Sequence, residues 1–151
     1  HVEAVYCPIG NNKLRTGFLS KAKELGFQTP SYIHPSVRIS PGVELGEGVY
    51  ILLGTNIMPY VRIGDYVMIS MGANIAHHSE LKYGTFISTG VNFGASIVAN
   101  AYSYVGISST VMTGIHELGE DCLVGAGAVV IRDVPANAIV AGVPAKVLRY
   151  K

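Results

Sequence analysis

The sequence lacks several features that would indicate other classes of protein. Its 151 residues include no tryptophan and only two cysteines, Cys7 and Cys122, which lie far apart and have no metal-binding spacing. A disulfide framework is therefore not expected, whereas a reducing compartment is. Charged residues make up only 14% of the chain and the net charge is +1, which gives no basis for binding nucleic acid or an acidic membrane surface.

Membrane spans and common catalytic motifs are also missing. No apolar run reaches the length of about 18 residues that a membrane helix requires, and no signal peptide is visible. The chain has no Ser-His-Asp order, no P-loop and no G-x-G-x-x-G motif. Its length is that of one domain. We expect a cytoplasmic protein that binds neither nucleic acid nor a membrane.

What the sequence does contain is a repeat of six residues. A large apolar side chain occupies nearly every sixth position, and a small or β-branched residue usually lies two positions before it. The sixth positions are Ile33, Ile39, Leu45, Ile51, Ile57, Ile63, Ile69, Ile75, Leu81, Ile87, Phe93, Ala99, Val105, Val111, Glu117, Leu123 and Val129. This period is neither the 3.6 residues of a helix nor the 2 residues of an ordinary strand.

A six-residue period is expected when short strands alternate with regular corners, with glycine where the backbone turns sharply. Three strands and three corners make a triangular coil, and successive coils stack about 4.8 Å apart. Each buried aliphatic side chain contributes roughly 1.5–3 kcal/mol, so the inward column outweighs local preferences. The predicted fold is an all-β solenoid over residues 31–134, with about five coils. A β-sandwich would show a period of two instead.

Residues 1–30 and 135–151 do not follow the repeat. We expect a short strand at 2–6 and a helix over 13–25. This strand–helix segment is expected to cover the first coil, whose core would otherwise face water. Residues 135–151 are expected to form a C-terminal tail. The repeat weakens around Glu117, which places a charge on the sixth position, so a bulge is expected there.

Several apolar side chains fall on positions that face outward from the coils. Because a monomer rarely exposes so much apolar surface, they favour self-association. A three-sided prism favours a trimer, in which a groove between neighbouring prisms would be built from two subunits. The residues are Leu52, Leu53, Met58, Met68 and Met71.

Two adjacent histidines are the main candidates for chemistry. His77 lies two residues after an inward position, so its imidazole should leave the core and suit proton transfer near neutral pH. His78 occupies a corner position, where histidine tolerates left-handed backbone better than most residues. Two neighbouring imidazoles also resist carrying charge together. A metal site is not expected, because His116 does not lie a whole number of coils from either histidine and so should not stack on them.

Motifs beyond the repeat make the pattern more specific. They are Ile75-Ala76-His77-His78, Gly84, Tyr104-Val105-Gly106-Ile107, Val124-Gly125-Ala126-Gly127-Ala128 and Val140-Ala141-Gly142-Val143-Pro144-Ala145-Lys146. With the repeat, they make the chain resemble the hexapeptide-repeat acyltransferases, in particular the sugar O-/N-acetyltransferases of the sialic-acid and bacillosamine biosynthesis type. The resemblance implies a left-handed parallel β-helix and a homotrimer. It also implies acetyl-CoA between two subunits, and transfer to the amine, or less readily the hydroxyl, of a nucleotide-linked amino sugar.

The resemblance also assigns roles to individual residues. His77 matches the general base that takes the proton from the sugar amine as its nitrogen attacks the thioester, and His78 stands beside it in the predicted catalytic site. Ala95, Ile107 and Gly125 match positions whose backbone contacts the CoA arm. These three are the predicted cofactor-binding residues, together with Lys146 near the nucleotide end.

This chain departs from the family pattern in three places. The family usually has Asp or Glu after its catalytic histidine, so His78 leaves the orienting role to Glu80 or to a neighbouring subunit. A second family histidine is replaced by Phe86, so backbone N–H groups would have to stabilise the oxyanion. Finally, residues 2–26 resemble only the last strand and helix of the family's N-terminal nucleotide-sugar domain. Two alternatives stay open: an inactive trimeric binding or structural protein, and a carbonic-anhydrase-like metalloenzyme.

Overall fold

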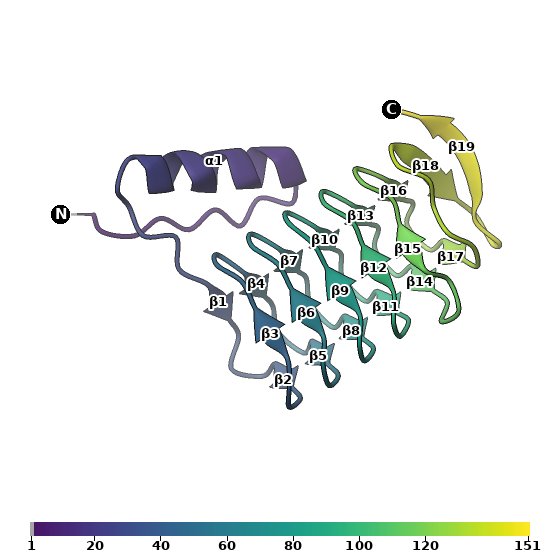
Figure 1. Ribbon diagram of the computed structural model, residues 1–151, viewed down its shortest axis with the longest axis horizontal. Helices are drawn as coiled ribbons and strands as arrows, with labels where there is room; N and C mark the ends of the chain where they lie inside the picture. Colours follow the sequence, from purple (N-terminus) through teal and green to yellow (C-terminus); the bar gives the residue numbers. More distant parts are fainter. Residues whose placement is uncertain (1) are drawn as a thin grey trace.

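The computed structural model describes residues 2–151 and contains three sheets that form the walls of a prism (Figure 1). The first wall consists of β1 (Tyr32–Ile33), β4 (Tyr50–Ile51), β7 (Met68–Ile69), β10 (Phe86–Ile87), β13 (Tyr104–Val105), β16 (Leu123–Val124), β18 (Ala138–Ala141) and β19 (Lys146–Tyr150). The second wall consists of β2 (Arg38–Ile39), β5 (Asn56–Ile57), β8 (Asn74–Ile75), β11 (Asn92–Phe93), β14 (Thr110–Val111) and β17 (Val129–Val130). The third consists of β3 (Glu44–Leu45), β6 (Arg62–Ile63), β9 (Glu80–Leu81), β12 (Val98–Ala99) and β15 (Glu117–Leu118).

The predicted solenoid is confirmed. Consecutive strands from β1 to β18 lie on different walls, each wall is parallel except for β19, and the arrangement of about six turns matches a left-handed β-helix. Ile57 pairs with Ile75, and Ile75 pairs with Phe93, each partner lying one coil further along the chain. These side chains point inward and are buried. The six-residue repeat therefore fixes both the coil length and the core.

The coil register shifts by one position after Val111. Val98 pairs with Glu117, whereas an unbroken repeat would pair it with His116, because the corner at 112–116 is one position longer than the others. The bulge expected around Glu117 is thus present. The expected inward positions Leu123 and Val129 are wrong, however, because the shift turns their neighbours Val124 and Val130 into the core instead.

The C-terminal segment is more than a tail. β18 adds a strand to the first wall beside β16, and its residues Ala138 and Val140 are buried in the core. β19 then folds back antiparallel on β18. The solenoid thus continues beyond residue 134, where the sequence pattern ends it.

The helix α1 (Asn12–Glu24) lies lengthwise along the first wall (Figure 1). The side chain of Asn11 caps it by accepting a hydrogen bond from the Leu14 amide at 3.0 Å. Leu19 on α1 packs against Tyr50 and Phe86, which point outward from that wall. The helix therefore packs on an outward-facing apolar column of the first wall. Successive coils each contribute one side chain to this column.

The expectation that the N-terminal segment covers the first coil is wrong. The inward-facing residues of that coil, Ile33, Ile39 and Leu45, stay 37%, 41% and 39% exposed. The expected strand at 2–6 is reduced to a single bridge between Ala4 and Gln28. Instead, α1 packs through Leu19 on the apolar column of the first wall.

The same helix changes the interpretation of one outward-facing residue. Met68 is buried beneath α1, so it does not argue for self-association, and Leu52 packs at the edge of the same cluster. Leu53, Met58 and Met71 remain exposed. Among residues 2–151, no helix is both long and apolar enough to cross a bilayer.

Candidate functional site

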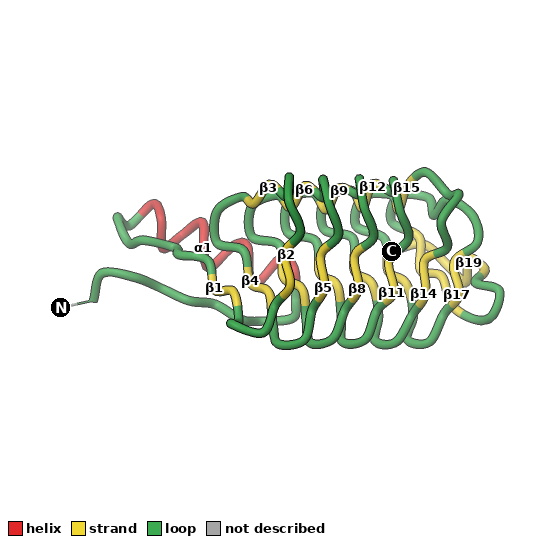
Figure 2. Tube along the Cα trace, turned by 90° about the horizontal axis from the view of Figure 1, so that it is seen from below, coloured by secondary structure: helices red, strands yellow, loops and turns green. Residues whose placement is uncertain are grey.

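His77 and His78 lie on the corner between β8 and β9, where the second wall meets the third. Figure 2 shows these two walls side by side along the solenoid. The carbonyl of His77 accepts a hydrogen bond from the Ser96 amide at 3.0 Å, and the amide of His78 donates to the Pro59 carbonyl at 3.1 Å. The corner is thus fixed between the corners of the neighbouring coils. Both side chains are exposed to solvent.

The two imidazoles contact each other directly. The Nδ1 atoms of His77 and His78 are 3.0 Å apart, and the rings are nearly perpendicular at 88°. A hydrogen bond between two Nδ1 atoms requires that one carry a proton and the other a lone pair. The two Nδ1 atoms therefore cannot both carry a proton in this contact. The ring of His78 also packs on that of Tyr60, with centroids 5.0 Å apart.

The backbone at His78 is unusual for a residue with a side chain. Its φ of +59° lies in the left-handed region that corners of this fold require. The equivalent corner position one coil earlier is Tyr60, with a φ of +61°. Because these two left-handed corners stack, the His78 imidazole lies against the Tyr60 ring, with its Nδ1 toward His77.

Two other predicted participants lie elsewhere. Glu80, a candidate for orienting His77, pairs instead with Arg62 on the third wall, with a closest N–O distance of 3.4 Å. Phe86, which replaces the family's second histidine, lies on the first wall. There its ring packs against Tyr104 at a centroid distance of 5.0 Å. Within residues 2–151, the hydrogen-bonding partner of the His77 imidazole is therefore another imidazole rather than a carboxylate.

A groove runs along the outer face of the second wall and holds a cavity of about 490 Å³. Its floor is a ladder of amide side chains, in which Asn56 donates to Asn74 and Asn74 donates to Asn92, each at 2.9 Å. Ala76, the residue before His77, lines the groove at one edge.

The predicted CoA-binding residues lie along the two edges of this wall. Ala95 is on the same line of corners as His77, one coil further along. Ile107 and Gly125 lie on the opposite line of corners in successive coils, where the Gly127 amide donates to the Ile107 carbonyl at 2.8 Å. The fold thus brings these three residues to one wall with His77. Lys146 lies on β19, where it pairs with Ala141 of β18, beside a cavity of about 240 Å³ lined by Arg132 and Asp133.

The sequence pattern missed a second oriented histidine. Nδ1 of His116 lies 3.3 Å from a carboxylate oxygen of Asp133. The other oxygen accepts the amides of His116 at 2.6 Å and Glu117 at 3.1 Å. These bonds hold the pKa of Asp133 below its usual value. The separation of His116 from Asp133, one position short of a coil, was the available signal.

The described chain, residues 2–151, contains no group of three or more histidine, cysteine or acidic side chains that could hold a metal ion. The corner presents two exposed imidazoles in hydrogen-bond contact, and imidazole is the side-chain group best suited to proton transfer near neutral pH. The adjoining groove offers amide and apolar surface to an extended ligand.

Comparison with solved structures gives a match over nearly the whole chain. The chain is 33% identical to GDP-perosamine N-acetyltransferase from Caulobacter crescentus, solved with CoA and GDP-perosamine and with one histidine replaced by alanine. The TM-score is 0.94, and the match covers 97% of this chain and 70% of the other. The acetyltransferase domain of PglB from Neisseria gonorrhoeae is 28% identical with a TM-score of 0.75, covering 96% of this chain and 70% of the other.

Curated relatives match over shorter stretches. A 2,3,4,5-tetrahydropyridine-2,6-dicarboxylate N-acetyltransferase from Enterococcus faecalis is 44% identical over 55 residues, which are 36% of this chain and 23% of the relative. A putative acetyltransferase from Schizosaccharomyces pombe is 38% identical over 60 residues, which are 40% of this chain and 28% of the relative. The chain thus spans only about a quarter of the length of these curated relatives. No model of a protein family matches it.

Proposed function

Since this chain belongs to the hexapeptide-repeat acetyltransferase family, we propose that it transfers the acetyl group of acetyl-CoA to the amine of a nucleotide-linked amino sugar. The observation that carries the proposal is the exposed imidazole pair at the edge of the second-wall groove. The 33% identity to an enzyme solved with CoA and GDP-perosamine supports the choice of both substrates. The buried, unpaired cysteines support the reducing cytoplasm as its location.

In the proposed reaction, His77 carries its proton on Nδ1 and donates it to Nδ1 of His78 in a hydrogen bond, which leaves the Nε2 lone pair of His77 free to act as base. The sugar amine attacks the thioester carbon and a C–N bond forms, while its proton passes to Nε2. The tetrahedral intermediate collapses as the C–S bond breaks. The CoA thiolate then takes the proton back from the imidazolium. Atoms and charge balance without a covalent enzyme intermediate.

In this proposal His78 replaces the carboxylate that usually follows the base in this family. A neutral imidazole can accept the Nδ1 proton of His77 and so fix its tautomer. It supplies less stabilisation to the imidazolium than a carboxylate would. Backbone N–H groups are proposed to stabilise the oxyanion, since Phe86 has no hydrogen-bond donor on its side chain.

We further propose that the protein is a homotrimer in which a second subunit closes the groove. Leu53, Met58 and Met71 are exposed on the two lines of corners that border the second wall, and packing there would cover them. Acetyl-CoA would then lie between two subunits, with its arm along the corners of Ala95 and Ile107 and its nucleotide end toward Lys146. Light scattering of the purified protein tests this, and a stable monomer would refute it.

The transferase activity is tested by release of free thiol from acetyl-CoA, with GDP-perosamine as acceptor. The His77→Asn variant is expected to lose roughly 10²–10⁴-fold in rate, the usual contribution of a general base. The matched control is His34→Asn, which changes a histidine on the first coil. Release that survives in His77→Asn removes His77 from the mechanism, and absence of release with the wild type favours an inactive binding protein. An acceptor that bears hydroxyl in place of the amine distinguishes O- from N-transfer.

A further inference from the structure

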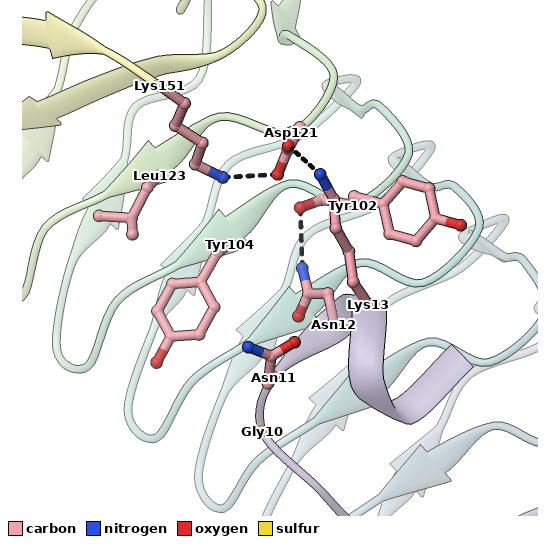
Figure 3. A pocket seen from close by; sticks show the side chains of 9 residues that line it. All are labelled: Gly10, Asn11, Asn12, Lys13, Tyr102, Tyr104, Asp121, Leu123 and Lys151. Atoms are coloured by element: carbon pink, nitrogen blue, oxygen red, sulfur yellow. Dashed lines mark hydrogen bonds and ion pairs between the residues drawn. The ribbon is translucent and has the colours of Figure 1, made fainter. Parts of the chain in front are cut away.

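A cavity of about 440 Å³ lies between the start of α1 and the far coils of the first wall (Figure 3). It is separate from the His77 corner, which joins the second and third walls. The residues that line it come from three parts of the chain: the turn before α1 with its first turn, the coils at 102–123, and the end of the chain. They include Asn12, Lys13, Tyr104, Asp121 and Lys151.

Asn12 leaves one hydrogen-bonding group without a partner in this cavity. Its Nδ2 donates to the carbonyls of Tyr102 at 2.8 Å and Ser103 at 3.2 Å, which fixes the orientation of the amide. Figure 3 shows the Asn12 oxygen on the side of Asn11 and Tyr104. The residue is only 7% exposed, and its Oδ1 has no partner among the described residues. A buried oxygen of this kind needs an N–H or O–H donor, because an unpaired buried acceptor keeps its full desolvation cost.

The rest of the cavity carries excess positive charge. Lys13 and Lys151 both bind Asp121, at 2.6 and 2.5 Å, so two cations share one carboxylate. The cavity also faces the N-terminal turn of α1, whose first amides have no partner inside the helix and attract negative charge. Tyr104 and Leu123 add apolar surface beside these groups.

We propose that this cavity binds a sugar phosphate. The phosphate oxygens accept from the two lysines and the first turn of α1, one sugar hydroxyl donates to Oδ1 of Asn12, and the ring lies against Tyr104. A bare anion leaves the Asn12 oxygen unpaired, and a neutral sugar leaves the excess positive charge unmatched. The proposal is independent of the proposed transferase activity, because it uses none of the residues at the His77 corner.

The test is calorimetric titration of the whole chain with three probes: glucose 1-phosphate, methyl phosphate and glucose. Glucose 1-phosphate is expected to bind one to one and at least tenfold tighter than the other two, since it alone satisfies both the charge and Asn12. Replacing both lysines, in Lys13→Met with Lys151→Met, is expected to weaken its binding at least tenfold. The control Lys21→Met changes an exposed lysine on α1 outside the cavity and is expected to leave binding unchanged.

A second measurement follows Asn12 without mutating it, since its amide also anchors α1. Its side-chain amide resonance is expected to shift when glucose 1-phosphate is added and to stay in place with methyl phosphate. Equal binding of the two phosphates, or an unmoved Asn12 resonance at saturation, would overturn the assignment. So would the absence of binding by all three probes up to about 10 mM, in which case a buried water satisfies Oδ1.

Discussion

Replacing Arg15 with methionine is expected to detach α1 from the first wall without unfolding the coils. Arg15 is fully buried, and within residues 2–151 it has no ion pair with a carboxylate. Its guanidinium instead donates to four backbone carbonyls: Ile9 at 2.9 Å, Tyr66 at 3.1 Å, Gly84 at 2.9 Å and Thr85 at 3.3 Å. Three of these acceptors belong to coil corners, so one side chain joins the helix to two successive coils.

The expected loss of stability of the α1 contact in Arg15→Met follows from two opposing effects on the buried guanidinium. Burial lowers the pKa of Arg15 to about 10, which corresponds to a cost of roughly 3 kcal/mol for keeping the charge in the interior. Hydrogen bonds from a charged donor contribute about 1.5–3 kcal/mol each, so the four together exceed that cost. Methionine fills a similar volume but leaves the four carbonyls without their donor. We expect the free energy that holds α1 in place to fall by roughly 3 kcal/mol.

Native-state hydrogen exchange measures this free energy locally. In Arg15→Met, amides of α1 are expected to exchange roughly a hundredfold faster, while the buried amides of Ile69 and Ile87 keep their rates. Lys21→Met, which changes an exposed residue of the same helix, serves as control and should leave both sets unchanged. Equal acceleration of helix and coil amides would refute the reasoning, because it would mean that α1 and the solenoid unfold together. Unchanged helix amides would refute it as well.

Three further predictions concern the corners. His78→Asp is expected to shift the acid limb of the pH–rate profile to higher pH, since a carboxylate favours the protonated form of the facing imidazole; an unmoved limb would contradict the proposed role. Gly106→Ala is expected to cost about 1–3 kcal/mol in urea unfolding, because the added Cβ would lie 2.5 Å from the Val124 carbonyl oxygen. Bonds from the His116 amide and its neighbour lower the pKa of Asp133, so their stabilisation is present above about pH 4 and lost as pH falls through the lowered value. An NMR titration against Asp133→Asn measures this loss.

The core of the solenoid was predictable because one physical requirement repeats in every coil. Ile57, Ile75 and Phe93 stack directly on one another in the second wall, so their spacing in the sequence is the coil length itself. Where the corner at 112–116 is longer, the spacing grows by one position and the prediction fails for everything downstream. A repeat read at fixed period cannot reveal an insertion unless the inward residue becomes polar, as at Glu117.

The position of α1 and the contacts at the candidate site were harder to predict. The helix is visible in the sequence, but the surface on which it packs is the outward column of Tyr50, Met68 and Phe86. This column can be recognised only after the coil register is known. The contact between His77 and His78 depends on a left-handed φ at a corner and on side-chain rotation. The left-handed φ follows from the corner position of His78 in the repeat, whereas the side-chain rotation does not follow from spacing.

The distribution of left-handed residues connects the fold to both proposed sites. On the corners between the first and second walls, glycine takes this conformation in most coils: Gly54, Gly72, Gly90 and Gly127. The other two lines of corners have glycine in this conformation at Gly42, Gly48, Gly84 and Gly114, but also residues with side chains such as His78, Tyr102 and Asp121. Each of these side chains costs roughly 1–2 kcal/mol relative to glycine. His78 contacts His77, and Asp121 binds Lys13 and Lys151. Side chains held in this strained backbone conformation thus contribute to both the imidazole pair and the α1 cavity.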